Sequence, residues 1–450
     1  MNAYIEETIK KVEQRDGEKP EFIQCVKEVL ASLDKVVDLH PEYIEENLFE
    51  RLVNPDRFIS FRVAWVDDNG TTQVNRGYRV QFNNEIGPYK GGLRFHPSVN
   101  PSIIHFLGFE QTFKNSLTGL PLGGAKGGSD FDPRGKSNKE IMRFCQAFMT
   151  ELYRHIGPDI DVPAGDIGVG GREIGYLFGQ YKRIRNAFKN GVLTGKGMSY
   201  GGSLIRPEAT GYGAVYYLCE VLKHENDDIK GKRVGVSGFG NVAWGAIKKL
   251  VELGAIPVTI SGPTGFVYDP DGICTEEKID FLLEMRASGR DKVEDYCDKF
   301  TNAQFFPNEK PWGVKMDIAM PCATQNEINL DEAKKLVANG VKYYIEVANM
   351  PTTEDAMEYF NEAKFVIVAP SKAVNAGGVC VSGLEMSQNS QRLNWTAEKV
   401  DKHLHNAMVN IHDASVAAAE KYGLGYDLVA GANIAGFEKV ADAMMAQGIF

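Results

Sequence analysis

The chain has 450 residues, of which 43% are hydrophobic. A single hydrophobic core stops growing below this length, so we expect two domains with a cleft between them. The formal net charge is −10, and no run of lysine or arginine is long enough to form a basic stripe. This charge pattern argues against nucleic acid as the main partner and favours a small molecule.

The amino terminus and the cysteines indicate a cytoplasmic protein. Residues 1–11 carry charges where a signal peptide has an apolar core, and no later stretch approaches the roughly 18 apolar residues that span a bilayer. The seven cysteines are scattered and form no C-x-x-C pair, and the eight histidines show no ligand spacing. We therefore expect reduced thiols, no membrane contact and no metal.

The first half of the chain combines helices with a β-hairpin. Apolar residues at helical spacing predict helices at 5–12 and 20–33. Residues 57–82 alternate apolar and polar side chains around the turn Asp67-Asp68-Asn69-Gly70, which is a strong hairpin signal. Helices resume near Ile103 and from Lys139 to Ile156, and we interpret the glycine-rich segments around them as loops.

One glycine-rich segment, residues 120–128, places Lys126 between two pairs of glycines. Glycine lacks a Cβ, so backbone and ligand can approach this lysine closely. A lysine acts as a base only when desolvation or neighbouring positive charge lowers its pKa from about 10.4 towards neutrality. Lys90, Lys114 and Asp166 stand in or beside similar segments. Single lysines are usually exposed surface groups, but this pattern favours one pocket shared by three lysines and an aspartate.

Beyond Gly201-Gly202 the composition changes and strands alternate with helices. The first predicted strand is followed by a helix at 242–253, and the predicted strands are 233–237, 257–260, 317–320, 342–347 and 365–368. This alternation predicts a parallel sheet covered by helices on both faces, as in the doubly wound dinucleotide-binding folds.

A G-x-G-x-x-A form of the dinucleotide fingerprint, residues 238–243, stands between the first of these strands and its helix. Gly238 makes the turn and Gly240 lets pyrophosphate approach the helix amino terminus. An acid that binds the adenosine ribose usually follows about twenty residues later. Here residues 261–265 contain no acid and no arginine, so this position leaves NAD and NADP both open.

Together these motifs resemble the glutamate dehydrogenase family, in particular its hexameric, short-subunit branch. The strings that carry the resemblance are 78–82, 120–133, 321–326, 348–352 and 431–437. The resemblance implies a two-domain α/β fold: a mixed-sheet domain for substrate binding and oligomerisation, and a Rossmann-like doubly wound dinucleotide-binding domain. The first would comprise residues 1–202 plus 426–450, and the second residues 203–425. It also implies a homohexamer.

The resemblance also implies roles for single residues. Lys126 would activate water, and Asp166 would pass protons to and from the substrate nitrogen. The groups that would bind the two carboxylates are Gly91, Gln111 and Lys114 for the α-carboxylate and Lys90 and Ser382 for the side-chain carboxylate. The residues expected on the cofactor side are Thr210, Gly238, Gly240, Asn241, Val242, Asn349 and Asn375, with Gly377 and Gly378 beside the nicotinamide. Ser382 and Asn375 also belong to types that often satisfy local backbone.

The implied reaction is the reversible oxidation of L-glutamate to 2-oxoglutarate and ammonium with NAD or NADP. We expect Lys90 and Lys114 to neutralise the two substrate carboxylates, and their charges to push Lys126 towards a neutral amine. Phe239, Trp244 and the Ser261-Gly262-Pro263 string favour NAD.

Two alternatives remain. A related branched-chain or aromatic amino-acid dehydrogenase would need an apolar residue in place of Lys90, because a lysine facing a hydrocarbon side chain is costly. A non-catalytic dinucleotide-binding regulator would need no lysine cluster.

Overall fold

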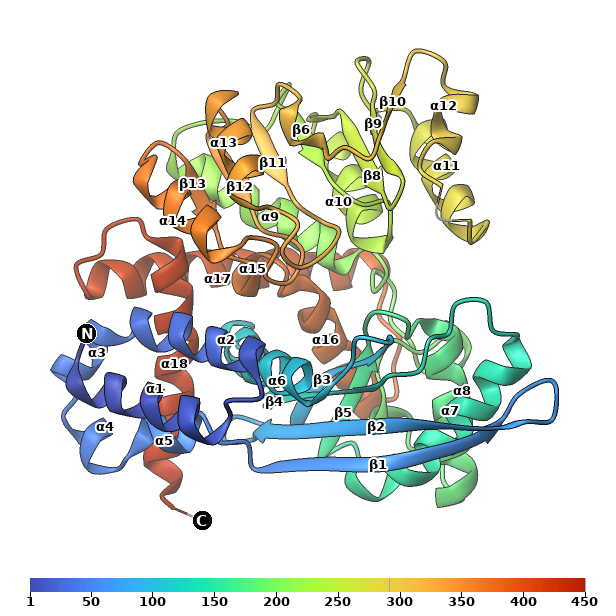
Figure 1. Ribbon diagram of the computed structural model, residues 1–450, viewed down its shortest axis with the longest axis vertical. Helices are drawn as coiled ribbons and strands as arrows, with labels where there is room; N and C mark the ends of the chain where they lie inside the picture. The colour runs from blue at the N-terminus through green and yellow to red at the C-terminus, as the bar shows by residue number, and fades with distance from the viewer. Residues whose placement is uncertain (291, 450) are drawn as a thin grey trace.

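The computed structural model describes residues 1–290 and 292–449. The chain forms two layered α/β halves, drawn one above the other in Figure 1. The blue and cyan first half lies below, the green to orange segments lie above, and the carboxyl-terminal helix runs back down into the lower half.

The lower half is built on a mixed five-stranded sheet of order β1-β2-β4-β3-β5. Its strands are β1 (Arg57–Val66), β2 (Thr72–Asn83), β3 (Tyr89–Phe95), β4 (Gly124–Ser129) and β5 (Asp161–Gly165). The predicted hairpin is confirmed: β1 and β2 pair antiparallel, and the Asp67 side chain accepts from the backbone N–H of Thr71. Strand β3 runs parallel to both β4 and β5.

Helices cover both faces of this sheet. They are α1 (Ala3–Arg15), α2 (Pro20–Ser32), α3 (Asp34–Leu39), α4 (Glu42–Glu45), α5 (Leu48–Leu52), α6 (Pro101–Leu117), α7 (Asn138–Leu152) and α8 (Gly171–Arg185). Helix α6 packs on β2 and β4, and α7 packs on β1 and α8. A capping box between Ser137 and Glu140 begins α7, which ends earlier than predicted, at Leu152. Short 3-10 turns occur at Tyr153–His155, Asn190–Val192, Met198–Tyr200 and Pro311–Gly313.

The prediction that the glycine-rich segments form loops was wrong, since they are strands β3, β4 and β5. Their glycines allow unusually close packing. A Cβ at Gly124 would lie 2.0 Å from Thr112 Oγ1 of α6, and one at Gly91 would lie 1.6 Å from the carbonyl oxygen of Ala125. Glycine is depleted in strand interiors, so composition alone favoured loops over a crowded strand.

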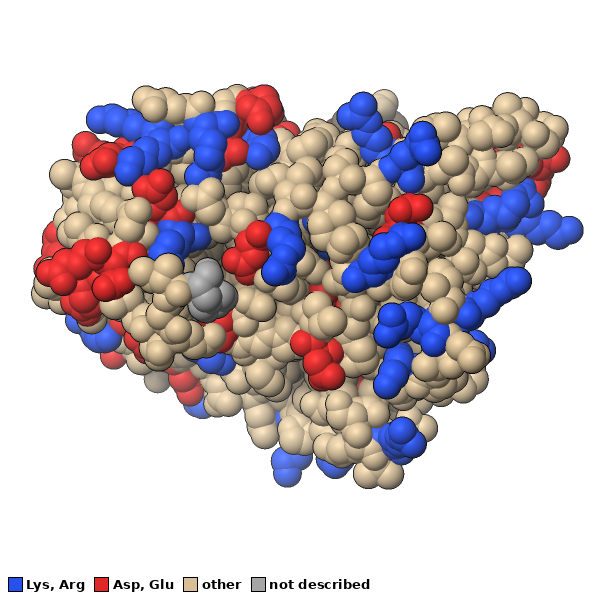
Figure 2. All heavy atoms as spheres, turned by 90° about the horizontal axis from the view of Figure 1, so that it is seen from below, with Lys and Arg blue, Asp and Glu red and all other residues tan. Residues whose placement is uncertain are grey.

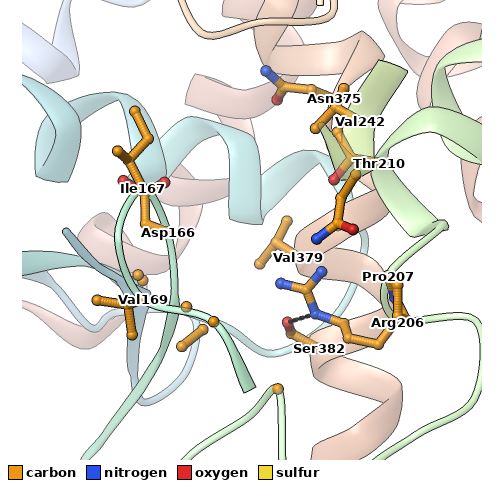
Figure 3. A pocket seen from close by; sticks show the side chains of 18 of the residues that line it. Asp166, Ile167, Val169, Arg206, Pro207, Thr210, Val242, Asn375, Val379 and Ser382 are labelled. Carbon is orange, nitrogen blue, oxygen red and sulfur yellow. Dashed lines mark hydrogen bonds between the residues drawn. The ribbon is translucent and has the colours of Figure 1, made fainter. Parts of the chain in front are cut away.

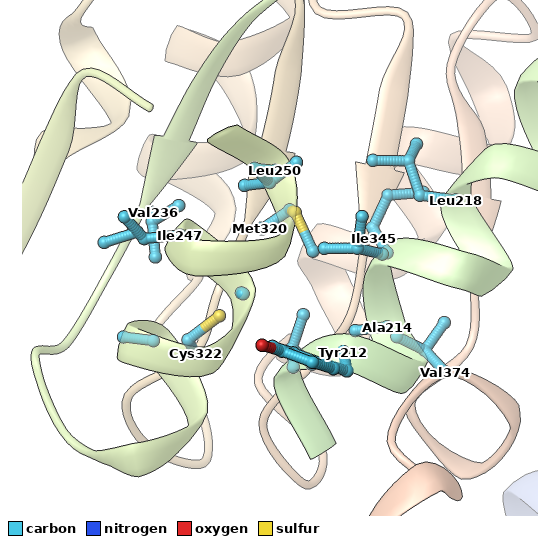
Figure 4. Close-up of a cluster of buried hydrophobic side chains, with 14 of the residues drawn as sticks. Tyr212, Ala214, Leu218, Val236, Ile247, Leu250, Met320, Cys322, Ile345 and Val374 are labelled. Carbon is cyan, nitrogen blue, oxygen red and sulfur yellow. The ribbon is translucent and has the colours of Figure 1, made fainter. Parts of the chain in front are cut away.

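The upper half contains an all-parallel sheet of order β13-β12-β11-β6-β7, which confirms the predicted fold class. The strands are β6 (Arg233–Val236), β7 (Ile256–Pro257), β11 (Ile318–Met320), β12 (Tyr343–Ile345) and β13 (Ile367–Ala369). The helices are α9 (Ala209–His224), α10 (Asn241–Glu252), α13 (Leu330–Ala338), α14 (Glu354–Glu362), α15 (Ser371–Val374), α16 (Gly377–Gln391) and α17 (Ala397–Lys421). Figure 4 shows Met320 and Ile345 of the sheet near Leu250 of α10 and Leu218 of α9. Helices α13 and α14 build a second core with Tyr344.

The predicted strand at 257–260 is divided in two. Residues 256–257 stay in the parallel sheet as β7, whereas β8 (Thr259–Gly262) turns away to pair with β9 (Gly265–Tyr268). Strand β9 pairs in turn with β10 (Gln304–Pro307), and the helices α11 (Glu276–Ala287) and α12 (Asp295–Lys299) lie between β9 and β10 in the chain. This separate antiparallel sheet was not predicted, because the predicted strand ended at residue 260, before the turn that leads into β9.

The carboxyl-terminal helix α18 (Leu428–Gln447) returns to the lower half, where it packs on α6 and α2 as well as on α17. Asp427 caps it by accepting from the backbone N–H of Ala430. Phe437 makes edge contacts with the rings of Tyr43 and Phe49, which binds the two ends of the chain into one core.

Three general properties of the chain are its surface charge, the state of its cysteines and the hydropathy of its helices. Basic and acidic side chains are interspersed with broad uncharged areas on the face shown in Figure 2. All seven cysteines are free. Among the residues described, no helix is both long enough and apolar enough to cross a bilayer.

Candidate active site

A pocket of about 730 Å³ lies between the two halves and is lined by residues of both. It gathers most of the predicted site residues, namely Lys90, Gly91, Gln111, Lys114, Lys126, Asp166, Thr210, Asn241, Val242, Asn349, Asn375 and Ser382. Figure 3 shows Asp166 on one wall and Arg206, Thr210 and Asn375 on the other. The fingerprint glycines 238 and 240 lie outside this lining, in the loop between β6 and α10.

Lys126 and Asp166 form an ion pair inside the pocket, in which the lysine is buried and the aspartate is partly exposed. Lys126 stands on β4 with 4% of its surface exposed, and its Nζ lies 3.2 Å from Asp166 Oδ1. Arg94 of β3 donates from Nε to the other carboxylate oxygen at 2.7 Å. A Cβ at Gly92 would lie 3.3 Å from Lys126 Nζ and 2.9 Å from Asp166 Cβ, so glycine there leaves room for the pair.

Burial and the charges nearby act in opposite directions on this pair. Burial raises the pKa of Asp166, but the Arg94 and Lys126 charges outweigh it and hold that pKa well below its usual range. For Lys126, burial lowers the pKa, Asp166 raises it and Arg94 lowers it, with a net lowering. Desolvation, which was expected to lower this pKa, is the largest effect, whereas the leading cation is Arg94 and not Lys90 or Lys114 as expected.

Helix α6 brings Gln111 and Lys114 to the pocket from one face. Asn100 and Pro101 start the helix, since the Asn100 side chain accepts from the N–H of Ile103. Lys114 donates to Asn349 Oδ1 across the gap between the halves at 3.3 Å. Burial and the charge of Lys126 lower the pKa of Lys114 to about 8. Lys114 therefore links the substrate side of the pocket to the loop after β12.

Lys90 lies deeper, with 1% of its surface exposed, and donates to Thr194 Oγ1 at 2.8 Å. Burial and the charge of Arg206 lower its pKa well below the usual lysine value. Ser382 of α16, which was expected beside Lys90, accepts instead from Arg206 Nε at 3.1 Å, as the dashed line in Figure 3 shows. The sequence analysis missed Thr194 and Arg206, which lie in irregular segments without a periodic pattern.

A second buried ion pair supports the segment that carries Thr194. Lys196 donates to Glu385 Oε1 at 2.7 Å, and the backbone N–H of Gly195 donates to Glu385 Oε2 at 2.9 Å. Both charged side chains are fully buried. Glu385 of α16 thereby ties this segment to the helix that bears Ser382. No local motif marked either residue in the sequence.

The residues on the cofactor side fit a bound dinucleotide. Gly238 has φ +77°, the left-handed conformation that favours glycine, and a Cβ at Gly240 would meet no atom within 4 Å. Helix α10 begins directly after Gly240, so its first N–H groups face this open space. Asn375 donates to Asn349 Oδ1 at 2.9 Å, and its own buried Oδ1 has no partner among the described residues. That oxygen suits an amide N–H such as the carboxamide of nicotinamide.

A group with metal-ligand character lies away from the pocket. Ligand atoms of Glu220, His412 and Asp413 come within 4.8 Å of one another. The ring nitrogens of His412 already contact Asp413 and Tyr426, at 3.2 and 2.8 Å. The absence of a metal therefore stays a prediction.

Comparisons with known proteins cover nearly the whole chain. Residues 55–183 match the Glu/Leu/Phe/Val dehydrogenase dimerisation domain, and residues 201–448 match the glutamate/leucine/phenylalanine/valine dehydrogenase family. The NAD-specific glutamate dehydrogenase of Clostridium symbiosum is 70% identical over 449 residues and covers 100% of both chains. The NADP-specific glutamate dehydrogenase of Haemophilus influenzae is 56% identical, covering 100% of this chain and 99% of its own. A solved glutamate dehydrogenase superposes with a TM-score of 0.99 at 69% identity over 100% of both chains.

Proposed function

Because the chain belongs to the glutamate/leucine/phenylalanine/valine dehydrogenase family, we propose that its pocket is the active site of a glutamate dehydrogenase. The reaction is the reversible oxidative deamination of L-glutamate to 2-oxoglutarate and ammonium, with NAD or NADP as the hydride acceptor. The observation that carries the proposal is the Lys126–Asp166 pair, 3.2 Å apart, in a pocket that is also lined by Lys90, Lys114 and the start of the fingerprint helix.

The substrate carboxylates match the arrangement of cations. Lys114, with Gln111 and the backbone of Gly91, binds the α-carboxylate, while Lys90 binds the side-chain carboxylate deeper in the pocket. Both lysine amines are desolvated, so a carboxylate partner restores the charged form that burial disfavours. Two fixed carboxylates orient the Cα–H bond by position alone.

The proton transfers are assigned to Lys126 and Asp166. Asn375 and Gly378 line the cofactor side of the pocket, where a bound nicotinamide would accept the hydride. Asp166 passes protons to and from the substrate nitrogen. Lys126, as a neutral amine, takes a proton from the water that attacks the iminium carbon, and returns it in the reverse direction. The two groups lie 3.2 Å apart, which is within reach of a proton transfer between them.

The proposed specificity for glutamate rests on Lys90. This lysine is 1% exposed, donates to Thr194 and lies near the Arg206 charge. A branched-chain or aromatic side chain would leave these polar groups unpaired in a dry site, which is costly. The alternative of an apolar amino-acid substrate is therefore disfavoured.

Replacement of Lys126 tests the proposal. Lys126→Ala is expected to abolish NADH formation from L-glutamate, because it removes the group that is proposed to accept the water proton, while coenzyme binding survives. Turnover is followed at 340 nm and coenzyme binding by calorimetry. The matched control is Lys139→Ala, at an exposed position on α7, and it should keep full activity. Substantial turnover by Lys126→Ala would refute the assigned role.

We also propose a homohexamer in the cytoplasm. The support is the match of residues 55–183 to a dimerisation domain. The proposed division assigns residues 1–202 plus 426–450 to substrate binding and assembly, and 203–425 to dinucleotide binding. The packing of α18 against α6 supports returning the carboxyl terminus to the first domain.

A further inference from the structure

We propose that Glu294, held beside the end of β8 by Thr264, is the residue that makes this chain prefer NAD to NADP. This inference rests on the proposed function, since it requires a dinucleotide bound along the fingerprint loop. The carboxylate would accept a hydrogen bond from the 2′-hydroxyl of the adenosine ribose and would repel a phosphate at the same position.

The end of β8 is the place where an acid is required. In dinucleotide-binding folds the ribose is bound by an acid about twenty residues after the fingerprint, next to the glycine-rich turn. Here the backbone N–H of Gly238 donates to Ser261 Oγ at 2.8 Å, so the end of β8 lies directly beside the fingerprint turn. The turn that follows, residues 262–265, contains no carboxylate of its own.

The structure supplies the missing carboxylate from a distant part of the chain. Thr264 Oγ1 donates to Glu294 Oε2 at 2.6 Å, across 30 residues of sequence. Packing around Gly262 fixes this contact, because a Cβ there would lie 3.2 Å from Val293 Cβ and 3.1 Å from the Phe239 ring. Glu294 thus contacts the residue that follows β8 by two positions, and its neighbour Val293 packs against Gly262 at the end of that strand.

The charge of Glu294 favours a ribose hydroxyl over a phosphate. Its side chain is partly exposed, and the hydrogen bond from Thr264 lowers its pKa, so the group is ionised at neutral pH. A 2′-phosphate carries a charge of about −1.5 to −2 at pH 7, and a carboxylate beside it is repulsive.

The arginines close to Glu294 in the sequence, Arg286 and Arg290, contact other residues. Arg286 donates to Asn241 Oδ1 at the start of α10, and Arg290 pairs with Asp295. Lys292 is exposed and is the cation that acts on Glu294. The contact with Asn241 places Arg286 at the helix terminus that faces pyrophosphate, and not beside Thr264.

Direct coenzyme binding tests the inference without turnover. Calorimetry gives the Kd of NADH and of NADPH for the full-length protein and for Glu294→Gln, Glu294→Ala and Thr264→Val. Glu294→Gln removes the charge and should tighten NADPH binding, whereas Glu294→Ala should also weaken NADH binding. For each Glu294 variant the ratio of the NADPH Kd to the NADH Kd should fall about tenfold, the size of one charge-assisted hydrogen bond. Thr264→Val, which releases the carboxylate, should lower the ratio less.

The matched control is Asp298→Asn, which makes the same change of charge at an exposed position on α12 and should leave the ratio unchanged. Melting temperatures check that each variant is folded. Unchanged ratios in the folded Glu294 variants would overturn this inference and leave the dehydrogenase assignment intact. A starting protein that binds neither coenzyme would overturn both.

Discussion

Arg94 is the residue that couples the two acid–base groups. It donates to the Asp166 oxygen that Lys126 does not contact, and only 3% of its surface is exposed. Its charge lowers the pKa of both Asp166 and Lys126. One buried guanidinium therefore keeps the acid ionised and favours the neutral amine at the same time.

Removal of this charge should shift the pH dependence of activity. In Arg94→Gln the pKa of Asp166 rises, and a step that needs the ionised carboxylate is then lost at a higher pH as the solution is acidified. The Lys126 pKa rises as well, so the pH at which the neutral amine appears also moves upward. We predict that the whole profile of kcat against pH moves to more alkaline values, as stopped-time assays from pH 5 to 10 will show.

Arg62→Gln, on the exposed face of β1, is the control for a lost arginine and should leave the profile in place. A profile of Arg94→Gln that coincides with that of the starting protein would show that the guanidinium does not act on either group.

Glycine-rich segments pointed to lysines that the structure brings into one pocket. Lys90 and Lys126 were singled out because glycine pairs flank or follow them, and Lys114 because it stands close to such a segment. Arg206 is half-buried and Glu385 is fully buried, but one lies in an irregular segment and the other in a helix without a motif. Their partners, Ser382 and Lys196, are far away in sequence. Such contacts depend on tertiary packing, so a local sequence pattern does not predict them.

At the scale of elements, the site depends on how closely α6 approaches strand β4. Gly124, the first residue of β4, packs against Thr112 of α6, and Gly91 of β3 packs against Ala125 of β4. These contacts set the distance between Gln111 and Lys114 on the helix and Lys126 on the strand. Close packing thus sets the spacing of the catalytic lysine and the substrate-binding groups.

Gly124→Ala should damage both stability and substrate binding. The new Cβ would lie 2.0 Å from Thr112 Oγ1 and 2.7 Å from Thr112 Cα, so helix α6 must shift. Such overpacking typically costs about 1–3 kcal/mol. We predict a lower Tm by calorimetry and a raised KM for glutamate, because α6 carries Gln111 and Lys114.

The control for this variant is Gly179→Ala on α8, where a Cβ meets no atom within 4 Å and helix propensity improves by about 1 kcal/mol. It should keep its KM and raise Tm slightly. If Gly124→Ala behaved like Gly179→Ala, the packing of α6 on β4 would not control the site.

Secondary structure was predictable where periodicity was clear. The hairpin and the parallel strands of the upper half were expected and are present. Two predictions of secondary structure were wrong. Strands β3, β4 and β5 were predicted as loops because they are rich in glycine. Strands β8 to β10 form a separate sheet that the alternation of apolar residues does not reveal. In both cases packing against a neighbour overrides the local preference.

Across the whole molecule, the site is complete only where the two halves meet. Lys114 of the lower half donates to Asn349 of the upper half, and Asn349 also accepts from Asn375 on the cofactor side. Arg206 reaches Ser382 in the same gap. Movement of one half against the other therefore changes substrate and cofactor contacts together, which suits a site that must exclude water during hydride transfer.

The proposed assembly makes a prediction of mass. Size-exclusion chromatography with light scattering should give a homohexamer a mass of about six times the chain mass of 49.7 kDa. The mass should not change over a tenfold dilution, because closed homo-oligomers of this kind bury large interfaces. A monomeric or dimeric mass would contradict the proposed hexamer without affecting the site within one chain.

The central claim is that burial lowers the pKa of Lys126 below that of an ordinary lysine, which makes its amine available as a base. Competitive labelling with acetic anhydride, read by peptide mass spectrometry against free lysine in the same sample, follows the protonation of this single amine as pH rises. The account predicts a midpoint for Lys126 below the usual lysine value of 10.5. A midpoint at or above 10.5 would contradict it.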